Sequence, residues 1–172
     1  MAAATVLVVD DDKSVLDFAT QALGAAGYAV LGATTGRRAL EIVNGGNRVD
    51  LVVSDVVMPE MRGPQLVREI RQVSPKTAVM LMSGYLADPA EMPAEVPFLA
   101  KPFSPRDLVA AVERTLAKCS QAREDLKVAR AQARQLRDER RRFCEELRET
   151  ARRSQDLIRD AQEQLKRGSK KR

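Results

Sequence analysis

Short apolar runs alternate along the first two thirds of the chain with segments in which apolar residues recur every three or four positions. The runs, typical of strands, cover residues 5–9, 28–31, 49–53, 77–82 and 98–100. The helical patterns cover residues 15–23, 39–43, 66–70 and 108–112. Three of the runs are almost entirely apolar, which is typical of strands covered by helices on both faces. The pattern therefore predicts an α/β fold with a parallel, helix-sandwiched sheet.

The last third of the chain follows a different pattern. All eight prolines and eight of the nine glycines precede residue 106, and neither occurs from Arg106 to Arg167. The residues there are mainly Ala, Leu, Glu, Gln, Arg and Lys, which favour helix. We expect a compact domain over 1–118 and a helical extension over 119–172 with a disordered end. An unbroken helix over 106–167 would be about 90 Å long.

A seam with alternating spacings of three and four residues can be traced along this extension. It passes through Ala122, Leu126, Ala129, Ala133, Leu136, Arg140, Phe143, Leu147, Thr150, Ser154, Leu157 and Ala161. Several of these residues are small or polar, so two outcomes stay open. The extension either pairs as a coiled coil with a partner, which includes a homodimer, or stays a single, solvated and partly frayed helix.

Composition excludes several kinds of chemistry. The chain has no histidine, which removes His-dependent catalysis and His-ligated zinc. Cys119 and Cys144 are far apart in sequence and are expected to be free thiols. The N-terminus lacks a basic leader, and no apolar run approaches the roughly 18 residues that a membrane span needs. We expect a cytoplasmic protein with no membrane contact.

The basic character of the chain belongs to its extension. Residues 1–118 have a net charge of −2, and residues 119–172 have a net charge of +7. A basic extension could neutralise nucleic-acid phosphates. However, ten acidic residues are interleaved with the bases, and no known DNA-binding motif is evident. We therefore favour a tethering or dimerisation role and keep a DNA-associated regulator as the alternative.

Polar residues follow four of the apolar runs. They are Asp10–Asp12, Ser54–Asp55, Ser83–Gly84 and Lys101–Pro102. The carboxyl ends of parallel strands meet at one edge of a sheet, so these residues should converge there. Carboxylates that converge repel one another, so either some are protonated or a hard cation neutralises them, and oxygen ligands suit Mg²⁺. Asp10, Asp11 and Asp55 are too few for a complete cage, which fits an ion that keeps waters and accepts a phosphoryl oxygen.

Each of these residues also has a simpler interpretation. Asp11 or Asp12 could cap the following helix, Lys101 could be a solvated surface lysine, and Ser83 could be a turn residue beside a glycine. The combination is more informative than its parts. Acids, a hydroxyl and an ammonium group at strand ends are the groups that transfer of a phosphoryl group to an oxygen nucleophile requires.

Four ordered blocks, VLVVDDDKSVL, DLVVSDVVMPEMRGPQL, VMLMSGY and FLAKPFSPRDL, resemble the receiver domain of two-component response regulators. The resemblance covers residues 4–118. It implies a flavodoxin-like, doubly wound sheet of five parallel strands in the order 2-1-3-4-5. It also implies a phosphoprotein that acts as a signalling switch and catalyses only its own phosphorylation and dephosphorylation.

The resemblance also implies a role for each site residue. Asp55 would be the phosphoacceptor. Asp11, Asp55 and the backbone carbonyl of Val57 would coordinate Mg²⁺ directly, and Asp10 would act mainly through water.

The resemblance assigns the remaining groups to the phosphoryl group and to the switch. Lys101 would pair with the phosphoryl oxygens, and its peptide bond to Pro102 would be cis. Ser83 would move to bond the phosphoryl group, and Phe98 would turn inward behind it.

Two features depart from the family pattern. Val57 and Tyr85 stand two positions after Asp55 and Ser83, and neither can position an attacking water, so we expect a long-lived phosphoryl group. Three prolines between residues 86 and 97 leave no room for the long helix that the family has there, so dimerisation through that face is not expected.

The function that we expect is a receiver-only response regulator. The SGY and FLAKPF blocks resemble receivers that serve hybrid histidine kinases, so its partner would be such a sensor kinase or a phosphotransfer protein. A phosphohydrolase or phosphotransferase of related fold would need a general acid at the position of Val57.

Overall fold

The computed structural model describes residues 3–84, 93 and 95–169, and of residues 160–169 it describes the backbone alone. The chain divides into two compact units, Met1–Gln121 and Ala122–Arg172. The first unit contains the sheet, and the described residues of the second are helical.

The sheet of the first unit has five strands that are parallel throughout. They are β1 (Thr5–Val9), β2 (Ala29–Ala33), β3 (Leu51–Asp55), β4 (Ala78–Ser83) and β5 (Phe98–Ala100). Their order across the sheet is β2-β1-β3-β4-β5. The structure confirms the expected flavodoxin-like, doubly wound fold.

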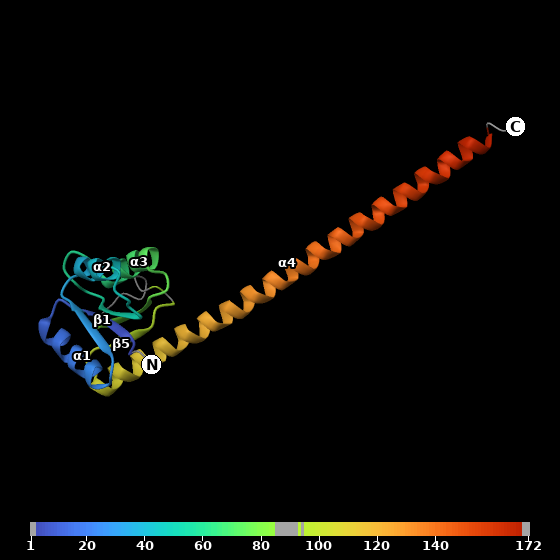
Figure 1. Ribbon diagram of the computed structural model, residues 1–172. Coiled ribbons are helices and arrows are strands. Elements are labelled where there is room, and N and C mark those ends of the chain that lie inside the picture. Colours follow the sequence, from blue (N-terminus) through green and yellow to red (C-terminus); the bar gives the residue numbers. More distant parts are fainter. Residues whose placement is uncertain (1–2, 85–92, 94, 170–172) are drawn as a thin grey trace. The chain divides into compact units, whose positions relative to one another are not determined.

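Helices cover both faces of this sheet. They are α1 (Lys13–Ala25), α2 (Gly36–Asn44), α3 (Gly63–Val73) and the first turns of α4 (Pro105–Ser169). Successive residues of β1 point to opposite faces, with Leu7 in the core under α2 and α3 and Val8 in the core under α1 and α4. Figure 1 shows α2 and α3 together on one side of the sheet and α1 on the other. The apolar runs are therefore the strands buried on both faces.

Local signals set the helix starts. Asp12 is the N-cap of α1 and accepts a hydrogen bond from the backbone N–H of Ser14 at 2.8 Å. Thr35 caps α2 in the same way. Ser104 and Asp107 bond reciprocally at the start of α4, where the Ser104 hydroxyl lies 2.7 Å from an Asp107 carboxylate oxygen.

The ends of β3 and β4 differ from the sequence prediction at the two candidate site residues that they carry. Asp55 and Ser83 were expected just after their strands, but each is the last residue of its strand. The ladder extends this far because Asp55 lies in register with Met82, and Ser83 with Ala100. Both polar residues are therefore fixed by backbone pairing.

The helical extension is as long as the sequence predicts, because α4 is one helix from Pro105 to Ser169. The described side chains from residue 122 to 159 are exposed. No helix in the described part of the chain is both long enough and apolar enough to cross a bilayer.

Three expectations fall wholly or mainly outside the described residues. They concern the disordered end, the side chain of Tyr85 and the segment without a long helix over 86–97. Of that segment, Pro93 and residues 95–97 are described, and they are not helical.

Candidate functional site

Two carboxylates lie side by side at the carboxyl edge of the sheet. Asp10 follows the last residue of β1, and Asp55 ends the neighbouring strand β3. The register pairs Val9 with Ser54, so the next residue on each strand brings the two acids together. Asp10 is 1% exposed and Asp55 is 7% exposed. Parallel pairing of β1 and β3 thus concentrates negative charge in a nearly buried position.

Lys101 joins these two acids. Its ammonium nitrogen lies 2.7 Å from Oδ2 of Asp10 and 2.6 Å from Oδ1 of Asp55. The backbone N–H of Lys101 donates to the carbonyl oxygen of Ser83 at 2.6 Å, which places the lysine beside the end of β4. The peptide bond between Lys101 and Pro102 is cis. One ammonium group therefore bridges the ends of β1 and β3.

Backbone N–H groups hold the other oxygen of each acid. Oδ1 of Asp10 accepts from the N–H of Asp12 at 3.0 Å, and Oδ2 of Asp55 accepts from the N–H of Val57 at 2.8 Å. All four carboxylate oxygens thus have a donor. Each carboxylate is therefore held by a donor at both of its oxygens, which fixes where its remaining lone pairs point.

The cluster of Asp10, Asp55 and Lys101 has fewer positive than negative groups. Burial of the Asp10 carboxylate raises its pKa above the usual 3.8, although hydrogen bonding and charge from Lys101 act in the opposite direction. Burial also works against the charged form of Lys101, but its bonds to the two acids outweigh this and raise its pKa above 10.5. The lysine therefore stays charged, and two carboxylates share a single cation.

The groups present fit a divalent cation that keeps part of its water shell. Oxygen donors suit Mg²⁺, which is usually held by one or two carboxylates together with waters and phosphate oxygens. Asp11 is exposed next to the buried pair. Among the residues that the structure describes, no group of three or more acidic or thiol side chains could form a complete metal cage. The donor set thus matches a partly hydrated Mg²⁺ and not an ion enclosed by protein.

The loop after β3 is fixed by close backbone packing. The N–H of Val56 donates to the carbonyl of Met82, and the N–H of Gly63 donates to the carbonyl of Val56, both at 2.9 Å. A Cβ atom at Gly63 would collide with the carbonyl oxygen of Asp55. Glycine is therefore required for α3 to start against the strand that carries Asp55. Val57, whose N–H reaches the acid, is 57% exposed.

Ser83 and Phe98 lie at the same region of the sheet but do not contact the acids through their functional groups. The Ser83 hydroxyl donates to the carbonyl of Gly84 at 2.9 Å and not to Asp55. Phe98 is 47% exposed on β5. The structure thus brings Asp10, Asp55 and Lys101 together, with Asp11 at the margin and the two expected switch residues facing elsewhere.

An aromatic contact that the sequence did not predict supports the lysine loop. The rings of Phe18 on α1 and Phe103 lie 6.1 Å apart at 48°. Phe103 follows Lys101 by two residues, so this contact ties the loop after β5 to α1. The chain has only four phenylalanines, but no periodic pattern links these two, and sequence reasoning had no signal for their contact.

Comparison with known proteins agrees with this geometry. A family model of the response regulator receiver domain matches residues 6–113. The chain is 45% identical over 120 residues to the sensor kinase CckA of Brucella abortus (strain 2308). The aligned segment covers 67% of this chain and 13% of that protein. The chain is 33% identical over 115 residues to the response regulator receiver protein CpdR of the same strain, which covers 64% of this chain and 95% of that protein.

A solved structure shows the same likeness. The crystal structure of the receiver domain from the hybrid histidine kinase CckA matches with a TM-score of 0.58 and 35% identity, over 66% of this chain and 99% of that one. The residues that the family model matches, 6–113, lie within the sheet-containing unit. The chain spans only a small part of several relatives, 13% of CckA and 25% of the DNA-binding transcriptional regulator NtrC of Azospirillum brasilense.

Proposed function

The chain belongs to the response regulator receiver domain family, and from this we propose that it is a signalling switch that accepts a phosphoryl group on Asp55. Receiver domains act as switches and not as enzymes that turn over an external substrate. The observation that carries the proposal is the placement of Asp55. Its carboxylate is nearly buried at a strand end, with an ammonium group on one oxygen and a backbone N–H on the other.

This placement suits nucleophilic attack on phosphorus. An oxygen of Asp55 forms a bond to the phosphorus of a phosphohistidine, and the bond from phosphorus to the imidazole nitrogen breaks. The leaving imidazole takes up a proton, and the aspartate becomes an acyl phosphate. Lys101, which already lies 2.6 Å from Asp55, is within reach of the phosphoryl oxygens and would offset their charge.

The cluster would bind Mg²⁺ through Asp11, Asp55 and the backbone carbonyl of Val57, with Asp10 acting through water. The cation, when bound, supplies charge that offsets the developing negative charge on the phosphoryl oxygens. Asp10 contributes by holding Lys101 in place, and the N–H of Val57 orients Asp55. Two nearly buried carboxylates that share a single ammonium group support the need for a second cation.

The phosphoryl donor in this proposal is a phosphohistidine on a sensor histidine kinase or on a phosphotransfer protein. The likeness to the receiver domain of a hybrid histidine kinase supports this class of partner. The chain itself has no histidine, so the phosphohistidine must lie on another protein or on another part of a longer one.

The switch would operate through Ser83 and Phe98. The Ser83 hydroxyl would leave the carbonyl of Gly84 and bond the phosphoryl group. Phe98, now 47% exposed, would turn inward behind it. Phe98 also lines a hollow with Thr115 and Lys118 at the edge formed by β5 and α4. Its movement would change the surface that a partner meets at this edge.

A phosphorylation assay tests the proposal. The protein is incubated with Mg²⁺ and a small phosphodonor such as acetyl phosphate, and the mass of the intact chain is measured. We expect the gain of one phosphoryl group. No gain is expected when a chelator that removes Mg²⁺ is present from the start, and none is expected in Asp55→Asn.

Asp12→Asn is the matched control, because asparagine caps a helix as well as aspartate does and Asp12 is already engaged as the cap of α1. It should be phosphorylated normally. Labelling of Asp55→Asn to the extent of the unchanged protein would refute the assignment of the acceptor.

A further inference from the structure

The second unit has an unpartnered apolar stripe. Seven large apolar side chains between residues 122 and 159 are exposed, and five of them fall on the seam traced in the sequence. These five are Leu126, Leu136, Phe143, Leu147 and Leu157, each between 50% and 70% exposed. The other two, Val128 and Ile158, lie off the seam. A long helix gains most of its stability from packing such a stripe against another element.

The stripe consists of two rows of residues seven positions apart. The first row is Leu126, Ala133, Arg140, Leu147 and Ser154, and the second is Ala122, Ala129, Leu136, Phe143, Thr150 and Leu157. These rows occupy the a and d positions of a heptad, with a at Leu126. Rows repeated at this period wind around a partner helix as a left-handed coiled coil.

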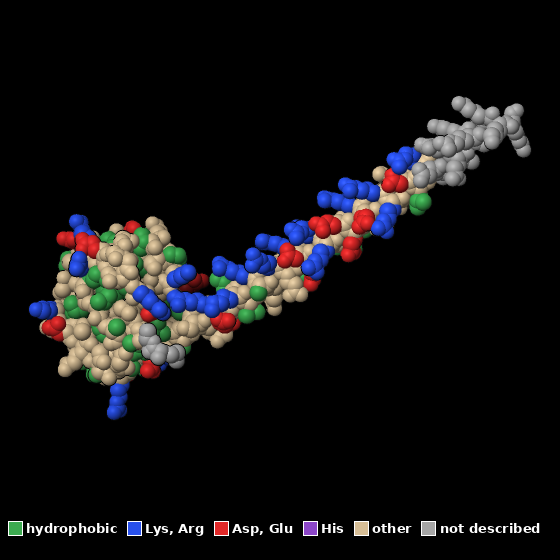
Figure 2. All heavy atoms as spheres, viewed as in Figure 1, with side chains coloured by type: hydrophobic (Ala, Val, Ile, Leu, Met, Phe, Trp, Pro, Cys, Tyr) green, Lys and Arg blue, Asp and Glu red, His purple; other side chains and the backbone are tan. Residues whose placement is uncertain are grey.

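Four ion pairs within the helix lie outside the stripe. The ion pairs Glu124–Lys127, Arg141–Glu145, Glu149–Arg153 and Asp156–Arg159 all join residues outside the two rows. Figure 2 shows acidic and basic side chains intermixed along this helix. The helix therefore already satisfies much of its outer charge with its own residues, whereas the stripe needs another surface.

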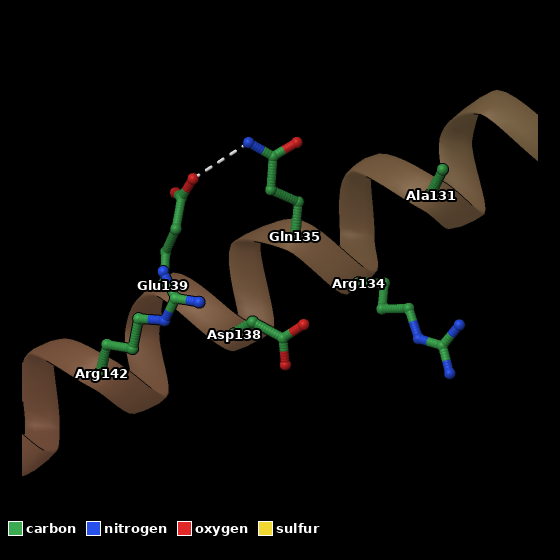
Figure 3. A pocket seen from close by; sticks show the side chains of 6 residues that line it. All are labelled: Ala131, Arg134, Gln135, Asp138, Glu139 and Arg142. Carbon is green, nitrogen blue, oxygen red and sulfur yellow. Dashed lines mark hydrogen bonds between the residues drawn. The ribbon is translucent and has the colours of Figure 1, made fainter.

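Figure 3 shows part of the polar outer face. Six residues line a shallow hollow there, and Gln135 donates to Glu139 at 3.1 Å. All six stand at positions other than a and d. A hollow on one face of a single helix cannot enclose a ligand, so we assign it no binding role.

Two charged rows flank the stripe, and they have opposite signs. The row that follows d begins with Arg123, Arg130 and Arg137 and then becomes uncharged. The row that precedes a contains Asp125, Glu139 and Glu146, with Gln132 and Arg153 as exceptions. These are the e and g positions, which set partner choice and orientation in coiled coils.

We propose that the stripe packs against the same stripe of a second copy of this chain, parallel and in register. In this arrangement Asp125 lies opposite Arg130 of the second copy, whereas Glu139 and Glu146 lie opposite the uncharged Cys144 and Ala151. An antiparallel pair with the same overlap would instead bring the acidic rows together, with Glu139 beside Glu146 of the second copy. The pairing of Asp125 with Arg130 and the like-charge contact of the antiparallel arrangement both favour a parallel second copy.

Arg140 lowers the stability of this parallel arrangement. In a parallel pair it faces Arg140 of the second copy in the seam, and Glu139 of the second copy is the adjacent residue of opposite charge. A single charged residue at an a position lowers stability but fixes the register, because any shift would place it against an apolar layer. The proposal is independent of phosphorylation at Asp55.

The first experiment is sedimentation of the full chain over a range of concentrations. We expect a monomer–dimer equilibrium. The double variant Leu136→Gln/Leu147→Gln should weaken it at least about 100-fold, because two leucines per chain lose their burial. Glutamine is a strong helix former, so the helix itself should persist, which circular dichroism checks.

Val128→Gln is the matched control. Val128 is 51% exposed, close to the 53% of Leu147, but it lies at a c position away from the seam. It should leave the dimer unchanged. A chain that is monomeric up to its solubility limit, or a dimer that the double variant and Val128→Gln weaken equally, would overturn the proposal.

The second experiment tests direction by disulfide formation in a Cys119→Ser/Cys144→Ser background. Leu136→Cys should form a covalent dimer with itself under mild oxidation, because facing d residues of a parallel pair lie within disulfide distance. Val128→Cys should not. If a mixture of Leu136→Cys and Leu147→Cys chains cross-links to each other in preference to themselves, the pair is antiparallel and the proposed orientation is refuted.

Discussion

The ammonium nitrogen of Lys101 lies 2.7 Å from Oδ2 of Asp10, although 91 positions separate the two residues. Two strands, β3 and β4, lie between β1 and β5 in the sheet. The lysine side chain reaches across the ends of both strands and meets Asp55 on the way. The cluster is therefore a product of strand order and side-chain length together.

Loss of this lysine should cost stability. Lys101→Met leaves the carboxylates of Asp10 and Asp55 nearly buried without their cation, so we expect a loss of about 1–3 kcal/mol in the free energy of unfolding. Urea unfolding with and without Mg²⁺ measures it, and the ion should restore part of the loss.

Lys127→Met is the control for this change. Its ion pair with Glu124 is exposed on both sides, so its removal should cost less than about 0.5 kcal/mol. Equal losses in the two variants would show that the bridge to Asp10 and Asp55 contributes nothing to folding.

Two glycine substitutions should act in opposite directions. Gly63→Ala places a Cβ against the carbonyl oxygen of Asp55, so it should destabilise the fold by about 1–3 kcal/mol and slow phosphorylation. Gly24 lies within α1 with nothing near its missing Cβ, and Gly24→Ala should stabilise by about 0.5–1 kcal/mol. Thermal unfolding measures both. A Gly63→Ala protein as stable as the unchanged chain would contradict the close packing.

The start of α4 should respond to pH. The hydroxyl and then the backbone N–H of Ser104 donate to Asp107 and hold the pKa of this carboxylate below 3.8. The folded state thus favours the ionised form. Its contribution to stability is present above about pH 3.8, the pKa in the unfolded chain, and is lost as pH falls through the lower pKa of the folded state.

Asp107→Asn tests this linkage, because asparagine keeps the shape but cannot ionise. The variant should be less stable than the unchanged chain near neutral pH, and the difference should shrink as pH falls below about 3.8. Urea unfolding at several pH values gives the difference directly. A difference that does not vary with pH would mean that ionisation of Asp107 plays no part.

The phosphoryl group on Asp55 should be long-lived, and one substitution should shorten its lifetime. Val57 is 57% exposed and offers no group that could position an attacking water. In Val57→Asn the amide could do so, and we expect loss of the phosphoryl group to be about ten-fold faster. Decay of the phosphorylated mass after removal of the donor measures the rate. A half-life of seconds in the unchanged chain would contradict the expectation.

Much of the fold was accessible from local pattern. The apolar runs located the strands because residues buried on both faces must be apolar, and the stretch without Gly or Pro located α4 because nothing interrupts its backbone bonds. Errors were confined to strand ends. Asp55 and Ser83 read as loop residues because polar side chains suggest a boundary, whereas pairing with a neighbouring strand extends the ladder through them.

The candidate site was accessible in part. The rule that strand ends converge indicated Asp10, Asp55 and Lys101, and the structure brings these three together. It does not join the Ser83 hydroxyl to them, since that group bonds the nearby carbonyl of Gly84. The contact of Phe18 with Phe103 had no local signal because it joins two segments that are distant in sequence.

The sequence by itself determined where the strands and helices lie apart from the exact strand ends, where charge accumulates, and which residues stand at the ends of apolar runs. These properties depend on neighbours within a few positions. Tertiary structure alone decided that one ammonium group serves two acids and that α3 starts against the carbonyl of Asp55. Such contacts depend on the register between strands, where a shift of one residue would turn each side chain to the opposite face of the sheet.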